Sequence, residues 1–169
     1  MSELNHFADT TTGVVFIHAA PTALCPHVEW ALASVLDASS AMRWEDQPAQ
    51  PGARKAVVDW IGPVGTGARL ADALSKWSML AFEVTEDPSD LVDGERFSHT
   101  PELGMWRGQT GASGDVVISE NRIRHLMESG PVAFHAAMQA ELGTACDAAL
   151  EPLRGHPTAA EVTWLSRVG

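Results

Sequence analysis

Basic residues are scarce in this sequence. Eleven lysines and arginines stand against 22 aspartates and glutamates, so that 169 residues carry a formal net charge of −11. Proteins that hold nucleic acid or an anionic membrane surface through phosphate contacts need the opposite balance. The sequence therefore predicts neither a nucleic-acid partner nor a membrane partner.

Cysteines and long apolar runs are also few. Two cysteines cannot build a disulfide framework in a chain of this length. The strongest apolar run, residues 14–17, is far shorter than the roughly 20 residues of a membrane span. The first residues contain Glu3 and Asp9 but no lysine, no arginine and no apolar signal-peptide core. We expect a cytoplasmic protein whose thiols stay reduced.

Apolar residues make up 45% of the chain, enough for one globular domain. Within this domain we expect an N-terminal arm over residues 1–12 and a ferredoxin-like unit over residues 13–85. An acidic loop, added strands and two helices are expected over residues 86–169.

The order of periodic segments predicts an α+β fold. A β-branched run at 13–18 indicates a central strand, and alternating residues predict the next strands near 42–44, 56–60 and 80–84. Helical spacing predicts one helix that Thr22 caps and that ends near Asp37, and a second over 62–77. This β-α-β-β-α-β order is typical of a ferredoxin-like antiparallel sheet with both helices on one face.

The second half of the chain predicts an extension of that sheet. The expected strands are 95–98, 103–107, 116–118 and, at the sheet edge, 162–168, and the expected helices are 120–127 and 132–150. Cys146 is expected in the core. The apolar stripe expected on the last helix consists of Phe134, Met138, Leu142, Ala145 and Ala149.

The glycine-rich start of the second helix is a candidate anion site. Backbone amides at a helix start attract anions, and a nearby arginine adds positive charge. The candidates are Gly65, Thr66, Gly67 and Arg69. The segment lacks the Lys-Ser/Thr ending of a Walker loop, and Leu70 replaces the third glycine of a dinucleotide fingerprint. The alternative is a turn in which Thr66 caps the helix.

A second group of candidates contains His18, Cys25 and His27, with His99 approaching from the later half. Such residues can form a thiolate nucleophile with a histidine base, or a zinc site. Their spacing matches no zinc motif, so we expect no metal and no cofactor. The alternative is that Cys25 packs as a small hydrophobe and His18 forms a hydrogen bond at the strand end.

Six acidic residues lie between positions 83 and 95, with a spacing that does not fit a calcium loop. They form either a solvated connection or a contact for a basic partner. The candidate residues of this chain for such a contact are Glu86, Asp87, Asp90 and Asp93. Trp30 and Trp106 are candidate exposed anchors for a protein. In contrast, Trp44, Trp60 and Trp77 are expected in the core.

Four segments resemble a small family of uncharacterised, cytoplasmic actinobacterial proteins with a domain of unknown function. The segments are residues 14–31, 62–70, 93–104 and 150–154, with Trp164 near the end. The resemblance covers nearly the whole chain. It implies no catalytic residue, cofactor or reaction.

The residues favour a non-enzymatic interaction or regulatory protein, for example one that modulates the division or chromosome-partition machinery. No nucleophile, base and orienting group are jointly evident, whereas an acidic surface and spare tryptophans suit a protein partner or a homodimer. The alternative is a small-molecule or anion-binding protein, or an enzyme, with a pocket near His18, Cys25, His27 and the 65–69 loop. An exposed apolar patch beside the acidic loop would favour the first hypothesis, and clustering of the pocket residues the second.

Overall fold

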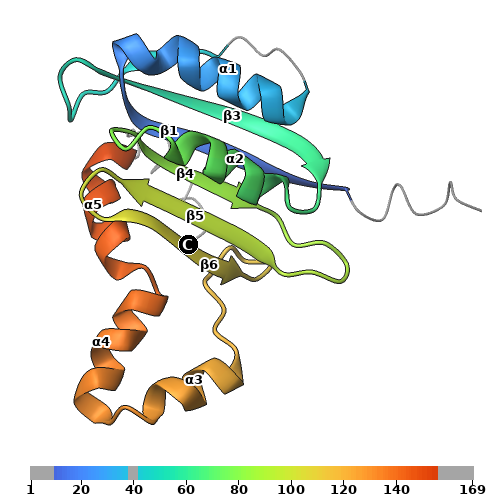
Figure 1. Ribbon diagram of the computed structural model, residues 1–169, viewed down its shortest axis with the longest axis vertical. Helices are drawn as coiled ribbons and strands as arrows, with labels where there is room; N and C mark the ends of the chain where they lie inside the picture. Colours follow the sequence, from blue (N-terminus) through green and yellow to red (C-terminus); the bar gives the residue numbers. More distant parts are fainter. Residues whose placement is uncertain (1–9, 38–41, 156–169) are drawn as a thin grey trace, which may run out of the picture.

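One antiparallel sheet organises the molecule. The computed structural model describes residues 10–37 and 42–155, and these contain six strands in the order β2-β3-β1-β4-β5-β6 (Figure 1). The strands are β1 (Thr10–Pro21), β2 (Glu45–Asp46), β3 (Ala53–Pro63), β4 (Ala81–Glu86), β5 (Gly94–Thr100) and β6 (Gly104–Thr110). The α+β architecture is therefore confirmed, and so is the central place of the first strand.

Helices pack on both faces of this sheet. Phe82 and Val84 of β4 belong to the core cluster that also contains side chains of α1 (Cys25–Leu36) and α2 (Thr66–Ser75). Glu83, between them in sequence, bonds to Arg154 of α5 (Thr144–Arg154). Because side chains alternate along a strand, α5 lies on the face opposite α1 and α2. A short 3-10 helix, η1 (Thr22–Leu24), precedes α1.

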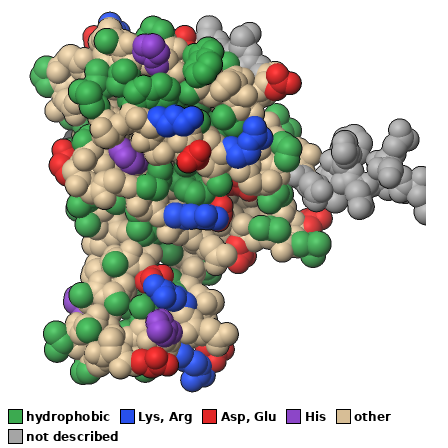
Figure 2. All heavy atoms as spheres, viewed as in Figure 1, with side chains coloured by type: hydrophobic (Ala, Val, Ile, Leu, Met, Phe, Trp, Pro, Cys, Tyr) green, Lys and Arg blue, Asp and Glu red, His purple; other side chains and the backbone are tan. Residues whose placement is uncertain are grey.

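Two further helices, α3 (Glu120–Met127) and α4 (Pro131–Glu141), lie at one end of the molecule, away from the sheet (Figure 1). Figure 2 shows the molecule narrowing between this end and the sheet. In α4 no residue is buried, and Val132 is 88% exposed. Among the described residues no helix has both the length and the apolar character of a membrane span.

The main core lies between the sheet and the pair α1 and α2. Val15 and Ile17 supply it from β1, and Leu32 and Leu70 supply it from the two helices. The apolar run predicted as a central strand therefore has one face in this core. Burial of such side chains makes the main contribution to the packing of the helices on the sheet. It stabilises the folded state by about 25 cal/mol per Å² of apolar surface removed from water.

A smaller cluster lies under α5. Leu150 is fully buried there, against Ala19, Ala53 and Ala81 of three neighbouring strands. Alanines at these positions leave room for the helix to approach the sheet closely, as small residues do in well-packed interiors.

The prediction of one continuous helix over residues 132–150 is wrong, because this segment forms two helices, α4 and α5. Gly143 has a φ of 68° between α4 and α5, a left-handed conformation that ends a helix and favours glycine. The break changes the register, so that Cys146 and Leu150 are buried instead of the predicted stripe, of which Ala145 and Ala149 are exposed. Cys146 is in the core as expected.

Smaller differences concern strands and caps. β2 has only two residues, and 116–118 forms an isolated bridge from Val116 to Thr110 and not a strand. Thr22 belongs to η1 and bonds to the Gly52 carbonyl, so it does not cap α1. The expected strand at 162–168 lies outside the described residues.

Gly13 provides a test of the packing between β1, β3 and β4. A Cβ at this position would overlap the Thr85 carbonyl oxygen and the Trp60 ring. We expect Gly13→Ala to lower the free energy of unfolding by about 1–3 kcal/mol, because neither backbone nor a buried indole can yield easily. Urea unfolding would measure this loss. Gly111→Ala is the control, since the nearest atom is 4.0 Å away; equal stability of the two variants would contradict this packing.

Candidate functional site

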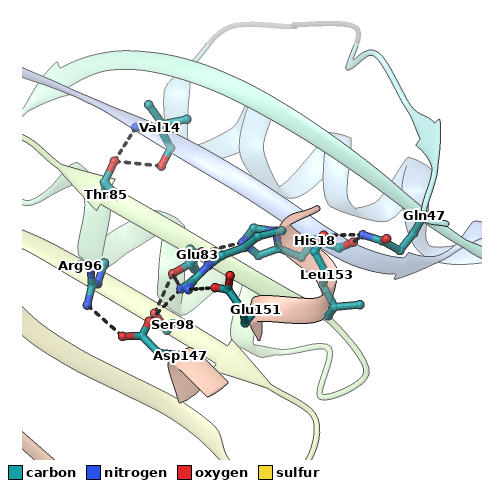
Figure 3. Close-up of polar contacts among 11 residues, drawn as sticks. Val14, His18, Gln47, Glu83, Thr85, Arg96, Ser98, Asp147, Glu151 and Leu153 are labelled. Carbon is teal, nitrogen blue, oxygen red and sulfur yellow. Dashed lines mark hydrogen bonds and ion pairs between the residues drawn. The ribbon is translucent and has the colours of Figure 1, made fainter. Parts of the chain in front are cut away.

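A buried charge network lies on the face of the sheet under α5. At its centre is Glu83 of β4, which is 7% exposed. His18 Nε2 lies 2.6 Å from Glu83 Oε2 (Figure 3). Arg154 donates to Oε1 at 2.6 Å and to Oε2 at 3.2 Å. Ser98 Oγ adds a donor 3.3 Å from Oε1. The carboxylate thus receives hydrogen bonds from two strands and one helix.

Further contacts connect this network to the rest of α5. Arg154 also donates to Asp147 Oδ1 at 2.8 Å, and Asp147 Oδ2 lies 3.8 Å from Arg96 Nη2 on β5 (Figure 3). The Gln47 side-chain amide donates to the carbonyls of His18 at 2.7 Å and Leu153 at 2.9 Å. The end of α5 is therefore fixed by both charged and neutral hydrogen bonds.

The network sets the ionisation of its central carboxyl. Burial raises the pKa of Glu83, but the hydrogen bonds from His18 and Arg154 and the positive charge of Arg154 outweigh burial and lower that pKa to about 2. The hydrogen bond to Glu83 in turn raises the pKa of Arg154. Because an ionised carboxylate can only accept, His18 Nε2 is the donor in its contact with Glu83.

A second buried carboxylate, Glu86, lies at the start of α2. Its Oε1 accepts from the Gly65 amide at 2.9 Å and its Oε2 from the Gly67 amide at 2.7 Å. These are the amides expected to hold an external anion. The chain's own carboxylate binds there, as favoured at a helix start. Arg69 is exposed.

Thr66 is not the cap of α2. It is the first residue of the helix, and its hydroxyl donates to the Pro63 carbonyl at 2.6 Å, while Gly65 holds the cap position. The capping prediction is wrong because Glu86, distant in sequence, satisfies the amides that a local cap would bind.

The structure does not bring the histidine and cysteine candidates together. His99 stacks on Phe82 at 5.1 Å on the face opposite His18, and its Nδ1 lies 2.7 Å from the Leu80 carbonyl oxygen. His27 is exposed beside Trp77. Cys25 is buried, and burial raises the pKa of its thiol, the opposite of what a nucleophile needs. In the described ranges no three metal-ligating side chains form a group.

The acidic segment divides into buried and exposed residues. Glu83 and Glu86 are buried, so the interpretation of a wholly solvated connection is wrong for them, and Glu86 is not available to a partner. Asp87, Asp90 and Asp93 are exposed.

The two candidate anchors also differ. Trp30 is 71% exposed. Trp106 contacts its own chain: its indole donates to the Ala140 carbonyl at 3.0 Å, and the Arg96 guanidinium lies 5.3 Å from its ring centroid. Of the expected core tryptophans, Trp60 is buried, whereas Trp44 and Trp77 are half-buried against the core.

Sequence reasoning missed the roles of Arg154, Asp147 and Gln47. The sequence does indicate where Glu83 points. Phe82 and Val84 face the main core, so the side chain between them lies on the other face of the sheet. The partner helix gave no such signal, since its register depends on the break at Gly143.

Comparison with known families gives one match. A family model described as "Protein of unknown function (DUF3145)" matches residues 14–167. The chain belongs to this family. No curated protein and no solved structure matches the chain. The DUF3145 match extends over the whole network from His18 to Arg154.

The buried network predicts a large effect of Glu83→Gln. The substitution removes the charge that neutralises Arg154, and breaking a buried ion pair costs about 3–5 kcal/mol. The control is Glu151→Gln, whose carboxylate is exposed and lies 3.4 Å from Arg154 Nη1, and which we expect to change stability by less than about 1 kcal/mol. Denaturant unfolding at pH 7 measures both changes.

The same pair predicts a pH dependence. Folding lowers the pKa of Glu83 from 4.5 to about 2, so its contribution is complete above pH 4.5 and disappears as the pH falls toward 2. The stability difference between the parent and Glu83→Gln should therefore shrink over this range. A difference that stays constant from pH 6 to pH 2 would contradict an ionised Glu83.

Proposed function

We propose that this protein acts without catalysis and binds a partner protein through the loop between β4 and β5. The observation that carries the proposal is the exposure of Leu91, 97%, and of Val92, 48%, at this loop. Asp90 and Asp93 flank the two apolar side chains. Apolar side chains of this kind, surrounded by charges, are typical of the centre and rim of a protein interface.

The surroundings of the loop support the same proposal. Ile61, at the end of β3, is 68% exposed, and a hollow at this end of the sheet is lined by Ile61, Thr10–Thr12 and residues 87–90. We define the loop surface as Ile61, Asp87, Asp90, Leu91, Val92 and Asp93. A partner that fits it has an apolar recess with basic side chains around it, because opposite charges at a rim speed association.

The alternative, a ligand or catalytic site at the 65–69 loop and the histidines, has less support. Glu86 binds the helix amides, Cys25 has a raised pKa, and His18 and His99 lie on opposite faces of the sheet. A catalytic site needs its groups within hydrogen-bond reach of one another. These positions favour the interaction hypothesis.

We also infer that residues 13–85 form a ferredoxin-like unit. The neighbour order β2-β3-β1-β4, antiparallel throughout, and the packing of α1 and α2 on one face support this inference. In this view β5 and β6 extend the sheet at β4. The fold alone implies no function.

The test is the affinity of a partner for loop variants. The intact chain would capture proteins from a lysate of its native cell, and the captured protein would be purified and titrated against variants of the chain. We expect Leu91→Ser combined with Val92→Ser to weaken binding at least about tenfold, because buried apolar anchors dominate interface energies. Val132→Ser, at a residue 88% exposed on α4, is the matched control and should bind as the parent does.

Charge provides the second readout of the same experiment. Asp90→Asn combined with Asp93→Asn should slow association at low salt, with a difference that shrinks as salt rises. Glu86 is left unchanged because it holds α2. Equal affinity of the parent and the Leu91 and Val92 variant, or loss of binding in Val132→Ser alone, would overturn the proposal.

A further inference from the structure

A separate recess lies where α5 ends on the sheet. Its volume is about 350 Å³, within the size range of pockets for small ligands. We define the α5 recess by six of its lining residues, Phe16, His18, Arg43, Lys55, Val57 and Arg154. It shares no residue with the loop surface.

Positive charge gathers around this recess. Arg43, Lys55, Arg69 and Lys76 are the cationic side chains that form no ion pair with a carboxylate of the described residues, and two of them line the α5 recess. Glu45 also lines it, opposite Lys55 in the pairing of β2 with β3. In a chain with a net charge of −11, two cations without ion-pair partners at one cavity form a local positive patch that attracts an anion.

The third cation, Arg154, is held in place. Glu83 and Asp147 accept from its Nη2 at 2.6 Å and 2.8 Å, which fixes the guanidinium at the edge of the recess. A guanidinium has five donors, and its Nη1 has only the 3.4 Å contact with the exposed Glu151. Arg154 therefore has donor capacity left for a ligand without a loss of side-chain freedom.

One wall of the recess, on the sheet, is apolar. Phe16 of β1 and Val57 of β3 are partners in the strand register, and Val57 is 61% exposed. The Phe16 ring is nearly parallel to the His18 imidazole, with centroids 5.9 Å apart. A flat ring can stack on such a surface, because aromatic groups favour offset contact with other rings.

We propose that the α5 recess binds a small organic anion in which a carboxylate or a phosphate is attached to a flat ring. The ring lies on Phe16 and Val57, and the anionic group lies among Arg43, Lys55 and Arg154. The combination of an apolar wall with a few convergent charges is the usual composition of a small-ligand site.

The experiment is a calorimetric titration of the full chain with four probes. Benzoate and phenyl phosphate carry both a ring and an anion, inorganic phosphate carries only the anion, and benzamide carries only the ring. We expect saturable binding of at least one ring anion, tighter than that of inorganic phosphate or benzamide. Benzoate and phenyl phosphate distinguish the two kinds of anionic group.

Variants locate the binding. Arg43→Ala combined with Lys55→Ala should weaken it at least about tenfold, because charge-assisted hydrogen bonds are lost. The matched control, Arg69→Ala combined with Lys76→Ala, removes the same charge elsewhere and should leave the affinity unchanged. Val57→Glu, at an exposed position, introduces a carboxylate into the recess and should abolish binding of the anions.

Three results would overturn the proposal. One is the absence of saturable binding of either ring anion. Another is equal loss of affinity in both double variants, which would indicate a general effect of charge. The third is unchanged binding to Val57→Glu, which would place the ligand elsewhere.

Discussion

The need to neutralise a buried carboxylate in the middle of the sheet governs how this molecule is arranged. An ionised glutamate that is 7% exposed would cost several kcal/mol without partners. His18, Ser98 and Arg154 meet this requirement at Glu83. For Arg154 to reach it from the last turn of α5, the helix must lie in one register, and in that register Leu150 packs on the alanines of the sheet.

Strand β4 carries a second buried carboxylate, which lies on its other face and also accepts hydrogen bonds. Glu86 points to the side of α2 and accepts the amides of Gly65 and Gly67, while Glu83 points to α5. Each carboxylate of this one short strand thus positions a helix on its own face. The loop that follows directly after Glu86 presents Leu91 and Val92, so the proposed loop surface extends from a rigidly held strand. The α5 recess depends on the same strand, because Glu83 fixes Arg154.

Local patterns predicted the elements that depend on local sequence. The β-branched run at 13–18 and the alternation at 80–84 predict β1 and β4, and the helix predicted over residues 120–127 has the bounds of α3. The roles of Glu83 and Glu86 could not be predicted in this way. The partners of Glu83, His18 and Arg154, lie 65 and 71 residues away, and a run of acidic residues resembles a solvated loop when these contacts are unknown.

The candidate anion site at residues 65–69 is taken by Glu86, and local sequence does not reveal this contact. The amides at Gly65 and Gly67 do bind an anion, but that anion is a side chain of the same protein. The register of α5 depends on the left-handed conformation of Gly143. The predicted apolar stripe continues one helix through this position, so it assigns the wrong face of α5 to the core. Arg154, which belongs to both the network and the recess, was therefore not recognised.

The most direct test of this account is a double-mutant cycle of Glu83→Gln and Arg154→Met, with the free energy of unfolding measured in denaturant at pH 7. If the pair positions α5, the effects of the two substitutions should not add, and the coupling energy should be about 2 kcal/mol or more. Additive effects, with a coupling energy below about 0.5 kcal/mol, would contradict the central role assigned to Glu83.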